Sequence, residues 1–199
     1  ERCPNKLLRP FGDTTLTDIV LNKLNKFDNS FFAGYEPTFK CKTETNGVRF
    51  VQRTEESVTV DKPITKVLSF LKDLEFEYFL IVNACLPFLK TETIQYFLDE
   101  CMLTKQSSFS VIERKNYFVD SNKSPLNFSS NLKTLDTKLV QPVNEFAHAL
   151  YFFNKDYFFE NGRYWDWSNV NYIPLKNEKE LIDVDTEEDF VFAEKLWKQ

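Results

Sequence analysis

The chain has 199 residues, enough for one domain with a buried core, and a formal charge of −5 at pH 7. Acidic and basic residues are mixed without a long basic stripe, which argues against binding to nucleic acid or to an anionic membrane. The longest apolar run, residues 78–84, is too short to cross a bilayer, and no signal peptide is recognisable, so we expect a cytoplasmic protein. The four widely spaced cysteines favour free thiols over a zinc site or a disulfide framework; they are Cys3, Cys41, Cys85 and Cys101.

The first half of the sequence alternates between helical and extended patterns. Helices are predicted where apolar residues recur every three or four positions, and strands where they alternate or run together. In chain order we expect a helix at residues 14–27, a strand at 31–36, a short helix, a strand at 48–53, a helix at 61–74 and a strand at 78–84.

The second half continues the alternation, with one interruption. We expect a helix at residues 91–102, strands at 108–112, 146–153 and 170–175, a short helix at 155–161 and a final helix at 186–198. Residues 113–144 are polar and lack periodicity, so they are predicted to leave the sheet as an arm. The alternation indicates a single α/β domain over residues 1–199, with a mostly parallel sheet covered by helices on both faces.

An acidic window, LIDVDTEEDF at residues 181–190, precedes the final helix. Asp183 and Asp185 are two residues apart in a loop after a predicted strand, where both carboxylates can face one Mg²⁺ ion. The same window also suits an acidic first helical turn, in which carboxylates interact with the helix dipole and with free amides. We assign Glu187, Glu188 and Asp189 to that second role, and Thr186 to the helix cap.

The opening segment, ERCPNKLLRPFG, distributes Arg2, Lys6 and Arg9 through a loop that leads to the first helix. Such a loop can present cations and backbone amides to a polyphosphate. Exposed basic residues are also common on any protein surface, and we expect Arg9 to be one of them.

Together, five segments of the chain resemble the acylneuraminate cytidylyltransferases, in the order in which that family has them. Pro4-Asn5-Lys6 is similar to the family's basic P-x-K loop, and the strand ending in Arg53 is similar to one that lies near the nucleotide. Residues 182–187, IDVDTE, are close to the family's I-D-I-D-T-E signature and are the most specific match. The other two segments are residues 82–88 and residues 149–151.

The resemblance implies a Rossmann-like, nucleotide-diphospho-sugar transferase fold with an arm that reaches across a homodimer. It implies transfer of CMP from CTP to a sugar acid, with release of pyrophosphate, for surface glycan biosynthesis. Mg²⁺ would be held by Asp183 and Asp185, and Lys6 and Asp185 would be the catalytic residues. The nucleotide would contact Arg2, Lys6, Arg53 and Asn83.

Aromatic residues are expected on the acceptor side. Tyr164 and Trp165 lie where the family has paired aromatics that reach into the partner's sugar pocket, although such rings equally suit a plain dimer interface. Tyr151, at a strand end, either lines the same pocket or is a core tyrosine with a satisfied hydroxyl.

The chain also departs from the family. The family's asparagine after the lysine is Leu7 here, its glutamine before the P-T-S-P turn is Asn83, and its Asn-Gly before A-I-Y is Ala147-His148. The family's first strand and its A-R-x-x-S phosphate loop are expected to precede residue 1. We expect His148 to be a strand residue first and a pocket residue second.

Two other functions fit the same residues. Asp183-Val184-Asp185 also matches the D-x-D metal motif of glycosyltransferases, although only one helix follows it here. A third interpretation is a non-catalytic descendant of the family that serves as a binding or dimerisation module. The altered pocket favours this interpretation, whereas the retained Lys6, Arg53 and aspartate pair disfavour it.

Overall fold

The computed structural model describes residues 3–59 and 62–199. Its first elements are helix α1 (Leu16–Leu24), strand β1 (Phe31–Gly34), helix α2 (Pro37–Asn46) and strand β2 (Arg49–Gln52). The Thr15 side chain caps α1 by accepting a hydrogen bond from the Asp18 amide. β1 and β2 are parallel neighbours, as expected for strands joined through a helix. All four elements confirm the predicted order of this region.

The prediction of one continuous helix at residues 61–74 is wrong. The structure has two short helices here, α4 (Ile64–Val67) and the 3-10 helix η1 (Ser69–Asp73). Helix α3 (Glu55–Val58) precedes them and strand β3 (Tyr78–Val82) follows. Pro63 precedes α4 with an extended backbone, and Leu68 leaves the helical conformation at φ −104° and ψ 23°. The spacing of apolar residues shows which side of a segment is buried. Two short helices with the same buried side produce the same spacing as one long helix. The predicted start at residue 61 lies outside the described residues.

Four strands form the main sheet, in the order β3-β5-β4-β6. It is completed by β4 (Ser107–Arg114), β5 (Val143–Asn154) and β6 (Val170–Pro174). β4 and β6 are parallel, in agreement with the predicted α/β class, whereas β5 is antiparallel to both of its neighbours. A parallel return needs a crossover, usually a helix, and the described residues between β4 and β5 contain none.

Helices connect and cover these strands. They are α5 (Thr91–Thr104), α6 (Lys155–Asn161), the 3-10 helix η2 (Glu178–Leu181) and α7 (Glu187–Trp197). The buried residues Ile94 and Phe97 of α5 pack with Leu150 and Phe152 of β5 in the largest core cluster. A second cluster joins the N-terminal loop and α1 to α7. In the described part of the chain, no helix is long and apolar enough to cross a membrane.

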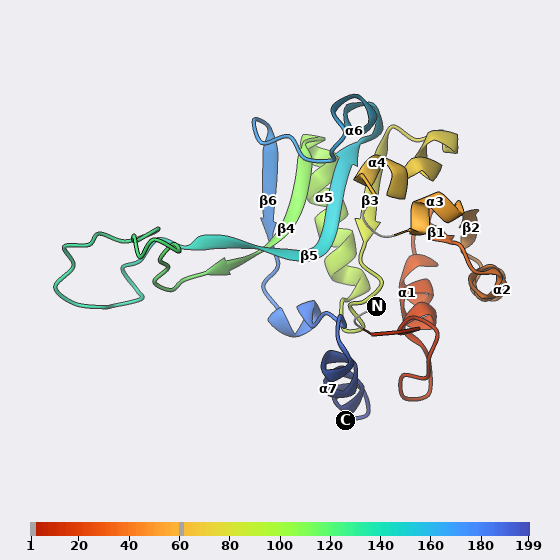
Figure 1. The fold of residues 1–199 in the computed structure, drawn as a ribbon, viewed down its shortest axis with the longest axis horizontal. Helices are drawn as coiled ribbons and strands as arrows, with labels where there is room; N and C mark the ends of the chain where they lie inside the picture. Colours follow the sequence, from red (N-terminus) through yellow and green to blue (C-terminus); the bar gives the residue numbers. More distant parts are fainter. Residues whose placement is uncertain (1–2, 60–61) are drawn as a thin grey trace.

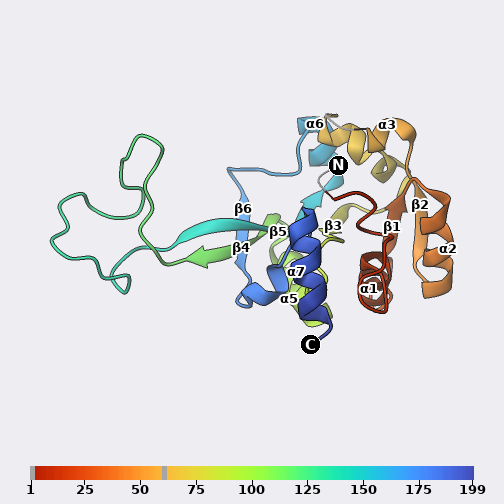
Figure 2. The same ribbon diagram turned by 60° about the horizontal axis from the view of Figure 1, so that its bottom comes forward.

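The segment between β4 and β5 projects away from the rest of the molecule, as Figures 1 and 2 show from two directions. It exposes large apolar side chains that the monomer does not bury: Val119, Leu126, Leu132, Leu135 and Leu139. The segment corresponds to the predicted arm, and its role in dimerisation stays a prediction.

A cavity of about 530 Å³ lies between β1 and β3, and most of its wall is apolar. Phe32 and Ala33 line it from β1, Leu80 and Val82 line it from β3, and Leu7 contributes from the N-terminal loop. Across residues 3–59 and 62–199, β1 is paired only with β2 and β3 only with β5. Each strand therefore has one edge without a strand partner, and the cavity separates the two strands.

Candidate active site at the carboxyl end of β3

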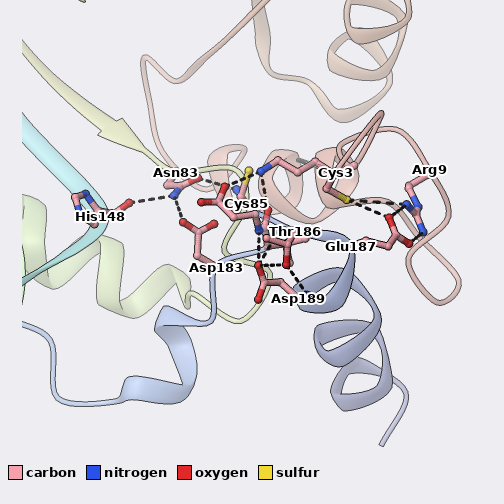
Figure 3. A network of polar contacts seen from close by, with 12 residues as sticks. Cys3, Arg9, Asn83, Cys85, His148, Asp183, Thr186, Glu187 and Asp189 are labelled. Atoms are coloured by element: carbon pink, nitrogen blue, oxygen red, sulfur yellow. Dashed lines mark hydrogen bonds and ion pairs between the residues drawn. The ribbon is translucent and has the colours of Figure 1, made fainter. Parts of the chain in front are cut away.

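Asn83, directly after β3, connects three segments of the chain (Figure 3). Its amide nitrogen Nδ2 donates to the His148 carbonyl at 3.0 Å and to Asp183 Oδ2 at 3.3 Å. Its Oδ1 accepts from the Cys85 amide at 2.9 Å, and its own backbone amide donates to the Ala149 carbonyl at 2.9 Å. One side chain thus holds the end of β3, the middle of β5 and the acidic window together.

The acidic window is held in place by Val184, which is fully buried in the cluster shared with α7. The Val184 amide donates to the Cys85 carbonyl at 3.0 Å, which ties the window to the loop after β3. In an extended segment, alternate side chains point the same way. Burial of Val184 therefore directs Asp183 and Asp185 away from that core cluster.

Lys6 reaches this window from the opposite end of the sequence. Its Nζ lies 3.0 Å from Asp185 Oδ1 and 2.6 Å from the Val184 carbonyl oxygen. Burial opposes the charge on Lys6, but neighbouring groups hold the pKa of Lys6 above its ordinary value. Burial also raises the pKa of the neighbouring Cys85, so that thiol is neutral and the charge that stabilises Lys6 is that of Asp185.

Asp183 is an unfavourably placed carboxylate. Burial and then the nearby charge of Asp185 raise its pKa above the ordinary value. Its Oδ1 is buried and has no hydrogen-bond partner among the described residues. A buried acceptor without a donor is costly, and a bound cation removes that cost. Asp183 therefore fits the predicted role of metal ligand.

The two aspartates are a small donor set. Among the described residues there is no group of three or more histidine, cysteine, aspartate or glutamate side chains that could hold a metal ion. Such a set suits Mg²⁺, which typically keeps several waters and substrate phosphates beside one or two carboxylates. Asp183 and Asp185 therefore suit a Mg²⁺ ion that also binds the phosphates of a substrate.

The raised pKa of Asp183 leads to a prediction about how the stability of the fold depends on pH. Between the ordinary carboxyl pKa and the raised value, the folded state keeps a proton that the unfolded state has lost, so stability falls as pH rises through this window. Asp183→Asn should therefore raise the unfolding midpoint at pH 7 by a few degrees, and by less at pH 4. Thermal unfolding at both pH values measures this. The exposed acid substitution Glu188→Gln is the control, and an Asp183→Asn protein that is less stable than wild type at pH 7 would contradict the prediction.

The first turn of α7 confirms the capping interpretation for the rest of the acidic window. Thr186 and Asp189 form a reciprocal capping box, in which the Asp189 amide donates to Thr186 Oγ1 at 3.2 Å and the Thr186 amide to Asp189 Oδ2 at 2.8 Å. Glu187 accepts two hydrogen bonds of 2.7 Å from the Arg9 guanidinium. Arg9 is therefore a partner of α7 and not only a solvated surface residue.

The predicted acceptor residues lie on the other side of Asn83. The hydroxyl of Tyr151 is 2.6 Å from Nδ1 of His148, and its ring packs edge-on against Tyr164 with 5.3 Å between centroids. Burial, Tyr164 and then Asp183 raise the pKa of Tyr151, so its hydroxyl is protonated. Trp165 packs on Tyr164 at 5.2 Å. These rings form one aromatic group, and its member Tyr151 lies close enough to Asp183 to interact with its charge.

Of the two predicted arginines, Arg53 is not part of this cluster. Arg2 lies outside the described residues. The Arg53 guanidinium donates to the Ser57 hydroxyl at 3.2 Å, to the Ser57 carbonyl and to the Val67 carbonyl at 3.4 Å. Burial lowers the pKa of Arg53. In the described structure Arg53 therefore organises α3 and α4 and lines the cavity beside β1.

Two further residues of this region had little sequence signal. Lys23 of α1 donates to the carbonyls of Leu86 and Pro87 at 2.9 and 2.8 Å, and burial lowers its pKa to about 8. It fixes the loop that follows Asn83, and only tertiary structure brings α1 to that loop. Glu180 of η2 accepts from the Lys90 amide at 3.0 Å and so caps α5 from outside the helix.

By sequence, the chain matches neither a protein-family profile nor a curated protein. Its structure is similar to CMP:2-keto-3-deoxy-manno-octonic acid synthetase complexed with CTP, with a TM-score of 0.69 and 10% identity, over 100% of this chain and 94% of that one. It is also similar to 4-diphosphocytidyl-2C-methyl-D-erythritol synthase from Anaerococcus prevotii, with a TM-score of 0.65 and 14% identity, over 96% and 88%. The chain has a nucleotidyltransferase fold. At this identity the likeness is one of fold, and it confirms the fold class that the sequence predicts.

Proposed function

We propose that the chain is a cytidylyltransferase that transfers CMP from CTP to a hydroxyl of a sugar acid and releases pyrophosphate. The observation that carries the proposal is the meeting of Lys6, Asp183 and Asp185 beside Asn83 at the carboxyl end of β3. Ligands of open α/β sheets bind at this end of the strands. The names of both structural neighbours refer to cytidylyl compounds, which supports CTP over other nucleotides.

Lys6 and the two aspartates form a charge pattern that suits a metal-bound triphosphate. In the proposed reaction the acceptor hydroxyl gives its proton to solvent and its oxygen bonds to the α-phosphorus. The bond from that phosphorus to the oxygen that bridges the α- and β-phosphates breaks, and pyrophosphate leaves with the negative charge. Lys6 neutralises that charge once it exchanges its contact with Asp185 for a phosphate oxygen. Asn83, with Arg2 and Arg53, is proposed to contact the nucleotide.

Mg²⁺ is the proposed cofactor, with Asp183 and Asp185 as its protein ligands. When bound, Mg²⁺ supplies charge neutralisation and orients the phosphates. The two aspartates suit a cation. Asp183 Oδ1 is buried without a hydrogen-bond donor from the described residues, and Asp185 carries a negative charge beside it. Val184 and Asn83 hold the two carboxylates in place.

Tyr151, Tyr164 and Trp165 are the proposed acceptor-binding residues. These three residues are partly exposed, Tyr151 interacts with the charge of Asp183, and aromatic rings suit the apolar face of a sugar. An acidic sugar is supported by the resemblance of the IDVDTE segment to acylneuraminate cytidylyltransferases. We place the reaction in the cytoplasm, where it would supply surface glycan synthesis.

We propose that the enzyme is a homodimer and that residues 115–142 contact the second copy. The exposed leucines of this segment, and the exposed Trp167 near Trp165, would be covered in such a dimer. Large apolar residues grouped on a projecting segment are typical of an interface.

The first strand that the family resemblance implies is proposed to occupy the cavity between β1 and β3. The apolar wall and the two strand edges without partners suit an extended segment with apolar side chains. Leu7 lines the same cavity, so the first described residues lie next to it. A strand at this place would join the two sheets into one.

Pyrophosphate release tests the proposed function. We expect release from CTP with a sugar acid such as N-acetylneuraminate or 2-keto-3-deoxy-manno-octonate, dependent on Mg²⁺ and abolished by EDTA. ATP in place of CTP is the matched control. Absence of release with every acceptor would contradict the proposal. In that case hydrolysis of a sugar nucleotide would favour a glycosyltransferase, and thermal stabilisation by CTP without turnover would favour a binding module.

A further inference from the structure

His148 has an unusual backbone conformation inside strand β5. Its φ is +50°, in the left-handed region that few residues other than glycine adopt, although asparagine, aspartate and histidine adopt it more often than the rest. The strand pairing is irregular at this place, because Phe109 pairs with Tyr151 but Val111 pairs with Phe146, which leaves extra residues on β5. Bulges of this kind redirect a side chain, and they are common beside active sites.

The contacts of His148 join the bulge to the candidate site. Its carbonyl accepts from Asn83 Nδ2 at 3.0 Å, and the same nitrogen lies 3.3 Å from Asp183. Its Nδ1 lies 2.6 Å from the Tyr151 hydroxyl, and its ring is exposed. Figure 3 shows His148 joined to Asn83 through its carbonyl oxygen, on the side of Asn83 away from α7.

We infer that His148 binds an oxygen of the acceptor substrate. The inference rests on the proposed function and adds a residue to it. In the tautomer in which the Tyr151 hydroxyl donates to Nδ1, the imidazole hydrogen is on Nε2, and this is the tautomer that we propose. Nε2 then donates to a carboxylate or hydroxyl oxygen of the acceptor, while Tyr151 fixes the orientation of the ring. A strained backbone is retained at such a position because the side chain it presents is used.

His148→Gly separates the side chain from the backbone strain. Glycine adopts positive φ freely, so the variant should unfold at a higher temperature than wild type. The loss of one hydrogen bond to a charged group should raise KM for the sugar acid about tenfold or more, with KM for CTP unchanged. Lys105→Gly is the matched control, since Lys105 has φ +54° at the end of α5 and should gain stability without a change in either KM.

Two further measurements identify the oxygen and the role of Tyr151. The methyl ester of the sugar acid should lose the tenfold effect if the carboxylate is the bound group and keep it if a hydroxyl is. Tyr151→Phe should raise KM for the acceptor in the same direction, because the ring loses its orienting partner. An unchanged acceptor KM in both variants would overturn the inference.

A binding measurement keeps this test separate from the proposed reaction. His148 is the only histidine of the 199 residues, so its imidazole resonances in a proton NMR spectrum need no assignment. Addition of N-acetylneuraminate or 2-keto-3-deoxy-manno-octonate, with CTP and Mg²⁺, should shift these resonances. If the wild-type protein releases no pyrophosphate but the resonances shift, the proposed function fails and His148 is still a ligand contact. Resonances that stay in place with both sugar acids would overturn the inference.

Discussion

Asp185→Asn is expected to lower the rate of pyrophosphate release by about 100-fold or more, the loss typical of removing one electrostatic contact to a transferring group. Asp185 has two roles in the proposed site. It is one of two carboxylates for Mg²⁺, and its Oδ1 holds the Lys6 ammonium at 3.0 Å. The substitution keeps the size of the side chain and removes its charge, so both roles are lost while the fold is kept. Steady-state rates at saturating Mg²⁺ measure the effect.

Glu188→Gln is the matched control for Asp185→Asn. Glu188 lies three residues away on the exposed first turn of α7 and should show wild-type rates. Lys6→Met should also lower the rate, and the double variant should lose less than the two separate effects combined, because both side chains are proposed to act on the same phosphates. Wild-type turnover in Asp185→Asn, or full additivity with Lys6→Met, would contradict the proposed site.

Extension of the chain at its N-terminus by the proposed first strand is expected to raise the unfolding midpoint by a few degrees. A strand between β1 and β3 would bury two or three apolar side chains, each contributing roughly 2 kcal/mol before the cost of ordering the segment. For a chain of this size, each net kcal/mol raises the midpoint by about 2–4 °C. Thermal unfolding of the two forms in parallel measures the difference.

Hydrogen exchange gives an independent measure of the same strand. The outward amides of β1 and β3 should exchange more slowly in the extended form, because they gain partners across the cavity. An extension of equal length with its apolar residues replaced by serine is the control and should leave both measurements unchanged. Equal midpoints and equal exchange in the native and serine forms would show that the cavity is not the place of this strand.

The elements of this fold follow from local patterns. Helices α1, α5 and α7 and strands β1, β2, β3 and β6 lie where apolar spacing predicted them, because one buried face leaves a period of 3.6 or 2 in the sequence. The capping box of α7 is also local, since Thr186 and Asp189 are three residues apart. The Asp183-Val184-Asp185 spacing likewise places two carboxylates together without any long-range contact.

The partners of these elements were decided by tertiary structure. β5 lies where a strand was predicted, but its antiparallel direction depends on the path of residues 115–142. Arg53 ends the predicted strand, yet its guanidinium is bound to carbonyls of the neighbouring short helices, which no spacing shows. The left-handed backbone of His148 and its contact with Tyr151 depend on a bulge in the sheet.

The candidate site combines both kinds of information. Sequence alone determined which residues carry the charge, Lys6 near one end of the chain and the two aspartates near the other. Only the tertiary structure brought Lys6 to 3.0 Å from Asp185 and placed Asn83 between β3, β5 and the acidic window. The physical reason is the distance along the chain over which each interaction acts. Periodicity and capping act over one or two turns of chain, whereas packing of Val184 and the N-terminal loop in one core decides which distant charges meet.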